Sequence, residues 1–197
     1  MFRNSHLTGE TWSKKTCCIA QLYDSAVTRP LKVVATLSGE SRSAEERMIE
    51  KLEAYLSKLL TSTDEKLFLQ IYLNYAPSNI CTNQLIAFQE KHRLTVNIMC
   101  VSDYYKNEEG LRLLLAHEKI LLEAFNEQVW EKFRESVQCL PLPDWDYSEE
   151  MKKRDRLTSS KFQKLSPNFQ KRRYSDTNID ERHRIKGRKL QYESLTQ

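Results

Sequence analysis

Hydrophobic residues along this chain change repeatedly between the spacing of strands and the spacing of helices. Two apolar runs, 16–23 and 31–37, are separated by a short polar turn, which predicts a hairpin. Residues 44–60 then place apolar side chains every three or four positions, as in a helix that buries one face. The same alternation continues through predicted strands at 67–73, 94–101 and 119–125 and predicted helices at 79–91, 108–118 and 127–137.

This order of elements, ββαβαβαβα, predicts an α/β fold in three layers. We expect one five-stranded mixed sheet with helices on both faces and parallel strand pairs in its later half. The pattern stops near Pro141, and the following residues are mostly polar or basic. Such a composition buries too little apolar surface to offset the entropy of ordering. We therefore expect a flexible start over 1–11, one domain over 12–140, and a basic, disordered tail over 141–197.

Charge is distributed unevenly between these parts. Residues 1–140 hold 17 Lys and Arg against 18 Asp and Glu, whereas residues 151–197 hold 14 against 5. Affinity for polynucleotides comes mainly from neutralising phosphates. The tail, and not the domain, is therefore expected to carry any affinity for RNA.

Three short segments of this tail are candidates for recognition. The basic clusters 152–154 and 182–189 suit nuclear import or RNA contact, and equally suit a tail that is merely solvated. Ser175 follows Arg172 and Arg173, the arrangement that basophilic kinases favour, so it is a candidate for phosphorylation.

Other features bear on location. No apolar run approaches the roughly 20 residues that span a bilayer, so no membrane partner is expected. The first residues lack the apolar core of a signal peptide. The five cysteines form no disulfide framework, which favours reduced thiols. We expect a protein of the cytoplasm, the nucleus or both, and not a secreted one.

Two short motifs stand where predicted helices begin. Ser43-Ala44-Glu45 opens the first helix, and Pro77-Ser78-Asn79-Ile80-Cys81 opens the second, directly after a strand. Zinc deaminases of nucleobases carry His-x-Glu and Pro-Cys-x-x-Cys in these two places. Over about residues 12–138 the chain resembles the AID/APOBEC cytidine deaminases, with serines at two of the three positions for zinc ligands.

Further segments support this resemblance. Residues 101–105, 109–114 and 130–133 are similar to the family's strand end with Tyr, its Gly-Leu-Arg helix and its last helix with Trp and Phe. Tyr75 and Tyr104 match the aromatic residues on which the family stacks its base.

The resemblance implies a chemistry that this chain has largely lost. In the family, a His and two Cys hold Zn²⁺, and the Glu moves protons between the bound water and the base. By position, Glu45 is a vestigial proton shuttle and Cys81 the one surviving ligand, while Ser43 and Ser78 occupy lost ligand positions. A neutral hydroxyl is a weak zinc donor, so no cofactor is expected.

The same residues also have purely structural interpretations. Ser43 and Ser78 are good N-cap residues. Glu45 lies in the first turn of a helix, where the dipole favours a carboxylate. Cys81 suits a small buried position. Adjacent cysteines at 17 and 18 point to opposite faces of a strand, and either could supply a thiolate only if that strand shifted toward the helix starts.

Three functions follow from these alternatives. The first is a catalytically inactive, deaminase-like module that binds a protein, or RNA through the basic tail. The second is an active, zinc-dependent cytidine deaminase acting on RNA or single-stranded DNA with an atypical ligand set. The third is an unrelated α/β domain whose motifs are coincidental. The position of Glu45 relative to Cys81 separates the third from the others, because the resemblance requires them to converge.

Overall fold

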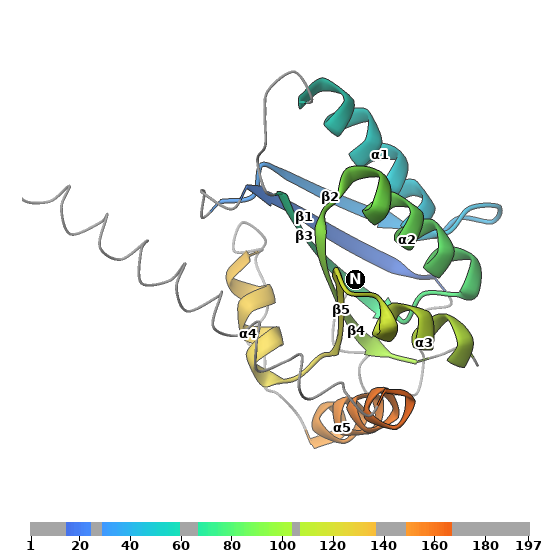
Figure 1. The fold of residues 1–197 in the computed structure, drawn as a ribbon. Helices are drawn as coiled ribbons and strands as arrows, with labels where there is room; N and C mark the ends of the chain where they lie inside the picture. Colours follow the sequence, from blue (N-terminus) through green and yellow to red (C-terminus); the bar gives the residue numbers. More distant parts are fainter. Residues whose placement is uncertain (1–14, 25–28, 60–66, 104–106, 137–148, 167–197) are drawn as a thin grey trace, which may run out of the picture.

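The computed structural model describes residues 15–24, 29–59, 67–103, 107–136 and 149–166. These residues form five strands and five helices (Figure 1). In chain order the elements are β1 (Cys17–Asp24), β2 (Lys32–Leu37), α1 (Ala44–Leu59), β3 (Leu67–Tyr75), α2 (Asn79–His92), β4 (Thr95–Ser102), α3 (Glu108–Ala116), β5 (Ile120–Ala124), α4 (Glu127–Ser136) and α5 (Glu149–Leu165).

The strands form one mixed sheet in the order β2-β1-β3-β4-β5. β1 runs antiparallel to both β2 and β3, with Cys18 opposite Thr36 on one side and Leu73 on the other. β3, β4 and β5 are parallel to one another, because α2 and α3 return the chain between them. The predicted α/β class, the mixed five-stranded sheet and its parallel later half are confirmed.

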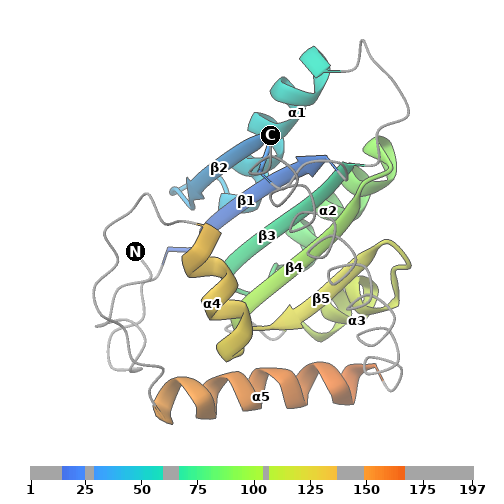
Figure 2. The same ribbon diagram turned by 90° about the vertical axis from the view of Figure 1, so that its left-hand side faces the viewer.

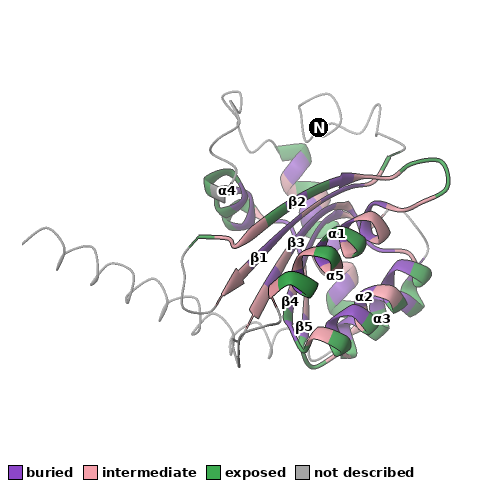
Figure 3. Cartoon of the chain, turned by 90° about the horizontal axis from the view of Figure 1, so that it is seen from above, coloured by how far each residue is buried: buried purple, intermediate pink, exposed green. Residues whose placement is uncertain are grey.

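Helices cover both faces of this sheet, and each face has its own core. α1, α2 and α3 lie together on one side and α4 on the other (Figure 3). The larger core joins residues of the first three helices, such as Met48 of α1, to alternate strand residues such as Cys18 and Ile98. The smaller core lies under α4, where Trp130 and Phe133 pack against the other strand face.

The end of the chain's ordered pattern was predicted wrongly. Residues 149–165 form a helix, α5, instead of part of a disordered tail. α5 packs against α3, β4 and β5, and Figure 2 shows it along the lower side of the sheet, next to β5. Met151 joins the core under α4, whereas Phe162 joins the larger core. The remaining parts of the predicted tail, 141–148 and 167–197, lie outside the described residues.

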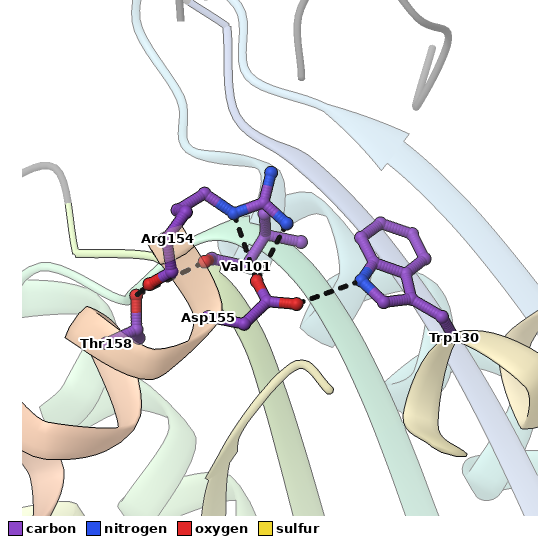
Figure 4. A network of polar contacts seen from close by, with 5 residues as sticks. All are labelled: Val101, Trp130, Arg154, Asp155 and Thr158. Carbon is purple, nitrogen blue, oxygen red and sulfur yellow. Dashed lines mark hydrogen bonds and ion pairs between the residues drawn. The ribbon is translucent and has the colours of Figure 1, made fainter. Parts of the chain in front are cut away.

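Polar contacts hold α5 in place where apolar residues are few (Figure 4). The indole N–H of Trp130 donates to the buried carboxylate of Asp155 at 3.3 Å. Arg154 donates to the same carboxylate through Nε at 3.0 Å and Nη2 at 2.7 Å. The hydroxyl of Thr158 donates to the Val101 carbonyl of β4 at 3.3 Å. These contacts satisfy the buried charge of Asp155, which explains how so polar a helix docks on the sheet.

Candidate functional site at two helix starts

The two motif serines cap the helices that they precede. The Ser43 hydroxyl accepts a hydrogen bond from the Glu46 amide at 3.0 Å, at the start of α1. The Ser78 hydroxyl accepts one from the Cys81 amide at 3.2 Å, at the start of α2. Both serines therefore satisfy amide groups that would otherwise lack a partner. The interpretation of Ser43 and Ser78 as N-caps is confirmed.

The side chains of the two motifs meet between these helix starts. The Ser43 hydroxyl and the Cys81 thiol both lie within hydrogen-bonding reach of the Glu45 carboxyl group. The Cys81 thiol is also within reach of Ser43 and Ser78. Glu45 is 3% exposed and Cys81 5% exposed, whereas Ser43 and Ser78 are half-buried, so the carboxyl and the thiol are the shielded members of the cluster. The convergence of Glu45 with Cys81, which the resemblance requires, is present.

Burial controls the protonation of this cluster. Desolvation raises the pKa of the Glu45 carboxyl above its ordinary value, and the hydrogen bonds from Cys81 and Ser43 only partly oppose it. Desolvation, followed by the nearby Glu45 charge, raises the pKa of the Cys81 thiol. Cys81 is therefore a neutral thiol at neutral pH, and it serves as a weak hydrogen-bonding group.

The donor set of this cluster does not fit zinc. Structural and catalytic zinc sites use at least three thiolate, imidazole or carboxylate ligands. Here one thiol and one carboxyl group are accompanied by two hydroxyls that already accept amide hydrogen bonds. Across the described ranges, no three His, Cys, Asp or Glu residues are grouped in a way that could hold a metal ion.

The neighbouring cysteines do not complete the set. Cys18 is fully buried, and its thiol donates to the Met48 sulfur at 3.5 Å. Desolvation raises the pKa of the Cys18 thiol well above its ordinary value, and the pKa of Cys17 is raised for the same reason. Both cysteines are neutral core residues at physiological pH. Cys17, Cys18, Cys81 and Cys100, the four in the described ranges, are free thiols.

The start of α3 closes against the start of α2, a contact that the sequence analysis missed. The Asn107 side-chain amide donates to the Pro77 carbonyl, and the Gly110 amide donates to the Asn79 side chain at 2.9 Å. A Cβ atom at Gly110 would lie 2.6 Å from the Asn107 side chain and 2.8 Å from that of Asn79, so any other residue here would force these asparagine side chains to move. The available signal was a pair of asparagines at successive helix starts.

Other candidates from the sequence fare differently. Tyr75 is 2% exposed within the central strand β3, so its ring is covered in this structure, and its assignment to base stacking stays a prediction. In the basic cluster 152–154, Arg154 is committed to Asp155 and Lys152 pairs with Glu149 at 2.8 Å. Tyr104, Ser175 and the cluster 182–189 lie outside the described residues.

Comparisons with known proteins add no family to this description. A scan against protein-family models and a search of curated proteins both find no match. Within the described ranges, no helix has the length and apolar content needed to cross a membrane.

The buried carboxyl group leads to a prediction about stability and pH. Folding raises the pKa of the Glu45 carboxyl, so as pH rises this carboxyl loses its proton in the unfolded chain before it does so in the folded one. The stability of the fold therefore falls as pH rises above 4.5, the ordinary pKa of a Glu carboxyl. Glu45→Gln removes the ionisation and should raise the melting temperature at pH 7. Thermal unfolding should show the gain shrinking as pH is lowered toward 4.5.

Glu46→Gln is the matched control for this measurement. Glu46 is in the same helix turn, but its side chain is 38% exposed and pairs with Arg42. This exposed change should leave stability within about 0.5 kcal/mol at every pH. A Glu45→Gln protein that melts below wild type at pH 7 would show that the ionised carboxylate stabilises the fold, contrary to our account.

Proposed function

We propose that this chain is a catalytically inactive protein with the AID/APOBEC-like deaminase fold, and that it works as a binding module. One observation carries the proposal: Ser43, Glu45, Ser78 and Cys81 converge at neighbouring helix starts. This is the place where the sequence resemblance puts a zinc site. The order of strands and helices around the cluster is compatible with that relationship.

The chemistry of the cluster supports inactivity. Deamination of a base needs a water molecule acidified toward neutral pH, and in the related enzymes a metal ion does this. The cluster offers only a neutral thiol, a buried carboxyl group and two hydroxyls engaged as helix caps. Ser43 and Ser78 therefore cap the two helix starts, and the proximity of Glu45 to Cys81 brings α1 next to α2. No group replaces the catalytic part of the metal's work.

The alternative is an active deaminase acting on RNA or single-stranded DNA. It is favoured by one observation, the retained Glu45, because burial raises the pKa of its carboxyl, the direction that favours proton transfer by a carboxyl group. That enzyme would need an additional ligand set for zinc from elsewhere in the chain.

The binding partner follows from location and charge. Reduced cysteines suit the cytoplasm or nucleus, where both RNA and protein partners are present. The excess of Lys and Arg after residue 150 favours RNA, since phosphate neutralisation is the main source of such affinity.

A deamination assay tests the proposal. Purified full-length protein, supplied with zinc, should convert no cytidine to uridine in single-stranded RNA, single-stranded DNA or free nucleoside. Glu45→Gln protein provides the background, because the substitution removes the only group able to move the proton. Zinc-dependent conversion that is lost in Glu45→Gln would establish the alternative.

A further inference from the structure

Helix α5 carries much of the positive charge that the sequence analysis placed in a tail. Residues 149–165, which form α5, hold six Lys and Arg against three acidic residues, whereas the described residues between 15 and 136 hold 13 basic and 15 acidic ones. The surplus therefore begins on a helix that packs against the sheet and α3. A fixed arrangement of charges can select the geometry of its ligand, which a flexible tail cannot do as sharply.

Half of the basic residues on α5 are committed to the fold. Lys152 pairs with Glu149, Arg154 with the buried Asp155, and Lys161 with Asp103 after β4. These side chains already have a counterion within the chain. They hold the helix in place and contribute little net charge to an external ligand.

The other half has no such role. Lys153, Arg156 and Lys164 are exposed and make no close ion pair with a described residue. After the hydrogen bond from Lys152, however, the charge of Arg156 also lowers the pKa of the Glu149 carboxyl. At 100° per residue they project away from the buried stripe of α5, which is formed by Met151, Asp155, Thr158 and Phe162. From 153 to 164 they extend over about 16 Å of helix. The result is a linear array of three exposed cations on the outward side of α5, with one exposed carboxylate, Glu149, at its start.

A hollow adjoins this array at Arg156. It has a volume of about 300 Å³ and lies between α5 and the end of β5. Polar groups of Asn126, Lys152 and Ser159 line the hollow. It also has two acidic residues, Asp155 and Glu127, and the carboxylate of Asp155 already accepts hydrogen bonds from Arg154 and Trp130. A volume near 300 Å³ is at the lower end of the range for ligand sites.

We propose that the outward side of α5, with this hollow, binds the phosphate backbone of single-stranded RNA. The proposal rests on the function proposed above and places the RNA-binding surface on the folded domain. Three exposed cations in line provide the phosphate contacts, and the hollow gives room for part of one nucleotide. An anionic membrane fits less well, because Leu157 is the one large apolar side chain that α5 exposes.

Salt-dependent RNA binding tests this surface in the full-length protein. The probe is a fluorescent single-stranded oligouridylate of 12 nucleotides, and anisotropy gives its affinity between 50 and 200 mM salt. Lys153→Gln, Arg156→Gln and Lys164→Gln together should weaken binding and reduce the slope of log K against log salt by about 2, since each phosphate contact on a single strand contributes about 0.7.

The control carries the same change in charge elsewhere. Lys51→Gln, Lys58→Gln and Lys119→Gln alter three exposed lysines of α1 and of the turn before β5. This control should retain the wild-type slope, and circular dichroism should show both triple variants folded. Equal losses in the two variants would mean that net charge alone acts, and the α5 surface would be rejected.

Two more outcomes would reject it. Wild-type protein that ignores the RNA but binds phosphatidylserine vesicles would reassign the cations to a membrane. Wild-type affinity in the α5 variant would place RNA binding elsewhere. A failure of the proposed function would give a different result, namely zinc-dependent deamination by the wild-type protein. That result does not depend on how the α5 variant responds to salt.

Discussion

Replacing Ser43 with His and Ser78 with Cys in one chain will create a zinc site where wild type has none. The substitutions restore His-Ala-Glu and Pro-Cys-Asn-Ile-Cys at the helix starts, with Cys81 as the third ligand. These side chains begin at positions whose present side chains already contact one another. Three protein ligands with a fourth position open to water form a stable zinc site.

Calorimetric titration should show zinc affinity at least about 100-fold above wild type, or about 2.7 kcal/mol. Loss of the two caps costs about 1 kcal/mol each without metal. Zinc at about 100 times its Kd should return about 2.7 kcal/mol, seen as a rise in melting temperature. Ser43→Ala with Ser78→Ala is the control, since it removes both caps and adds no ligand, so zinc should not restore its stability.

The variants with only one of the two substitutions should bind zinc weakly, because each offers two of the three ligands and two ligands do not enclose the ion. Catalysis need not return with the metal, since Glu45 and Cys81 are buried. A folded double variant with the zinc affinity of wild type would mean that the backbone of the two helix starts does not have the geometry of a metal site. The proposed relationship to the deaminases would then be abandoned.

Phe162→Ala should destabilise the protein by about 3–5 kcal/mol. Phe162 is 0% exposed and packs in the core that also includes α3 residues such as Leu111. Its loss leaves a cavity between α5 and the body of the domain. Leu157→Ala, five residues earlier at a side chain that is 64% exposed, should change stability by less than about 0.5 kcal/mol. Urea unfolding of the two variants makes the comparison.

This result bears directly on where the domain ends. Without α5, the smaller core would lose Met151 and the larger core would lose Phe162. If Phe162→Ala is as stable as wild type, α5 contributes nothing to folding, and the chain behaves as though the domain ended before it.

The failure to predict α5 has a clear physical reason. Its buried positions, 151, 155, 158 and 162, have helical spacing, but two of the four are the polar residues Asp155 and Thr158. A search for apolar periodicity does not register such a helix. Its docking depends on partners far away in sequence, Trp130 and Val101, and spacing within the helix does not reveal them.

Local signals, in contrast, located the candidate site well. Capping is decided within four residues, so Ser43 and Ser78 could be recognised as caps from their neighbours alone. The burial of Tyr75 could not be inferred from its sequence neighbours, because the end of a strand is accessible only if the strand is at the edge or its end is uncovered. β3 is flanked by β1 and β4, and its last residue is still paired with Ser102.

Zinc content of the purified wild-type protein tests the central claim most directly. That claim is that the capping serines and the proximity of Glu45 to Cys81, and not a metal, hold the starts of α1 and α2 together. The protein should be expressed in zinc-supplemented medium, purified without chelators and weighed intact by native mass spectrometry. Our account predicts a mass with no tightly bound zinc. One zinc ion retained per chain, and lost in Cys81→Ala, would contradict it.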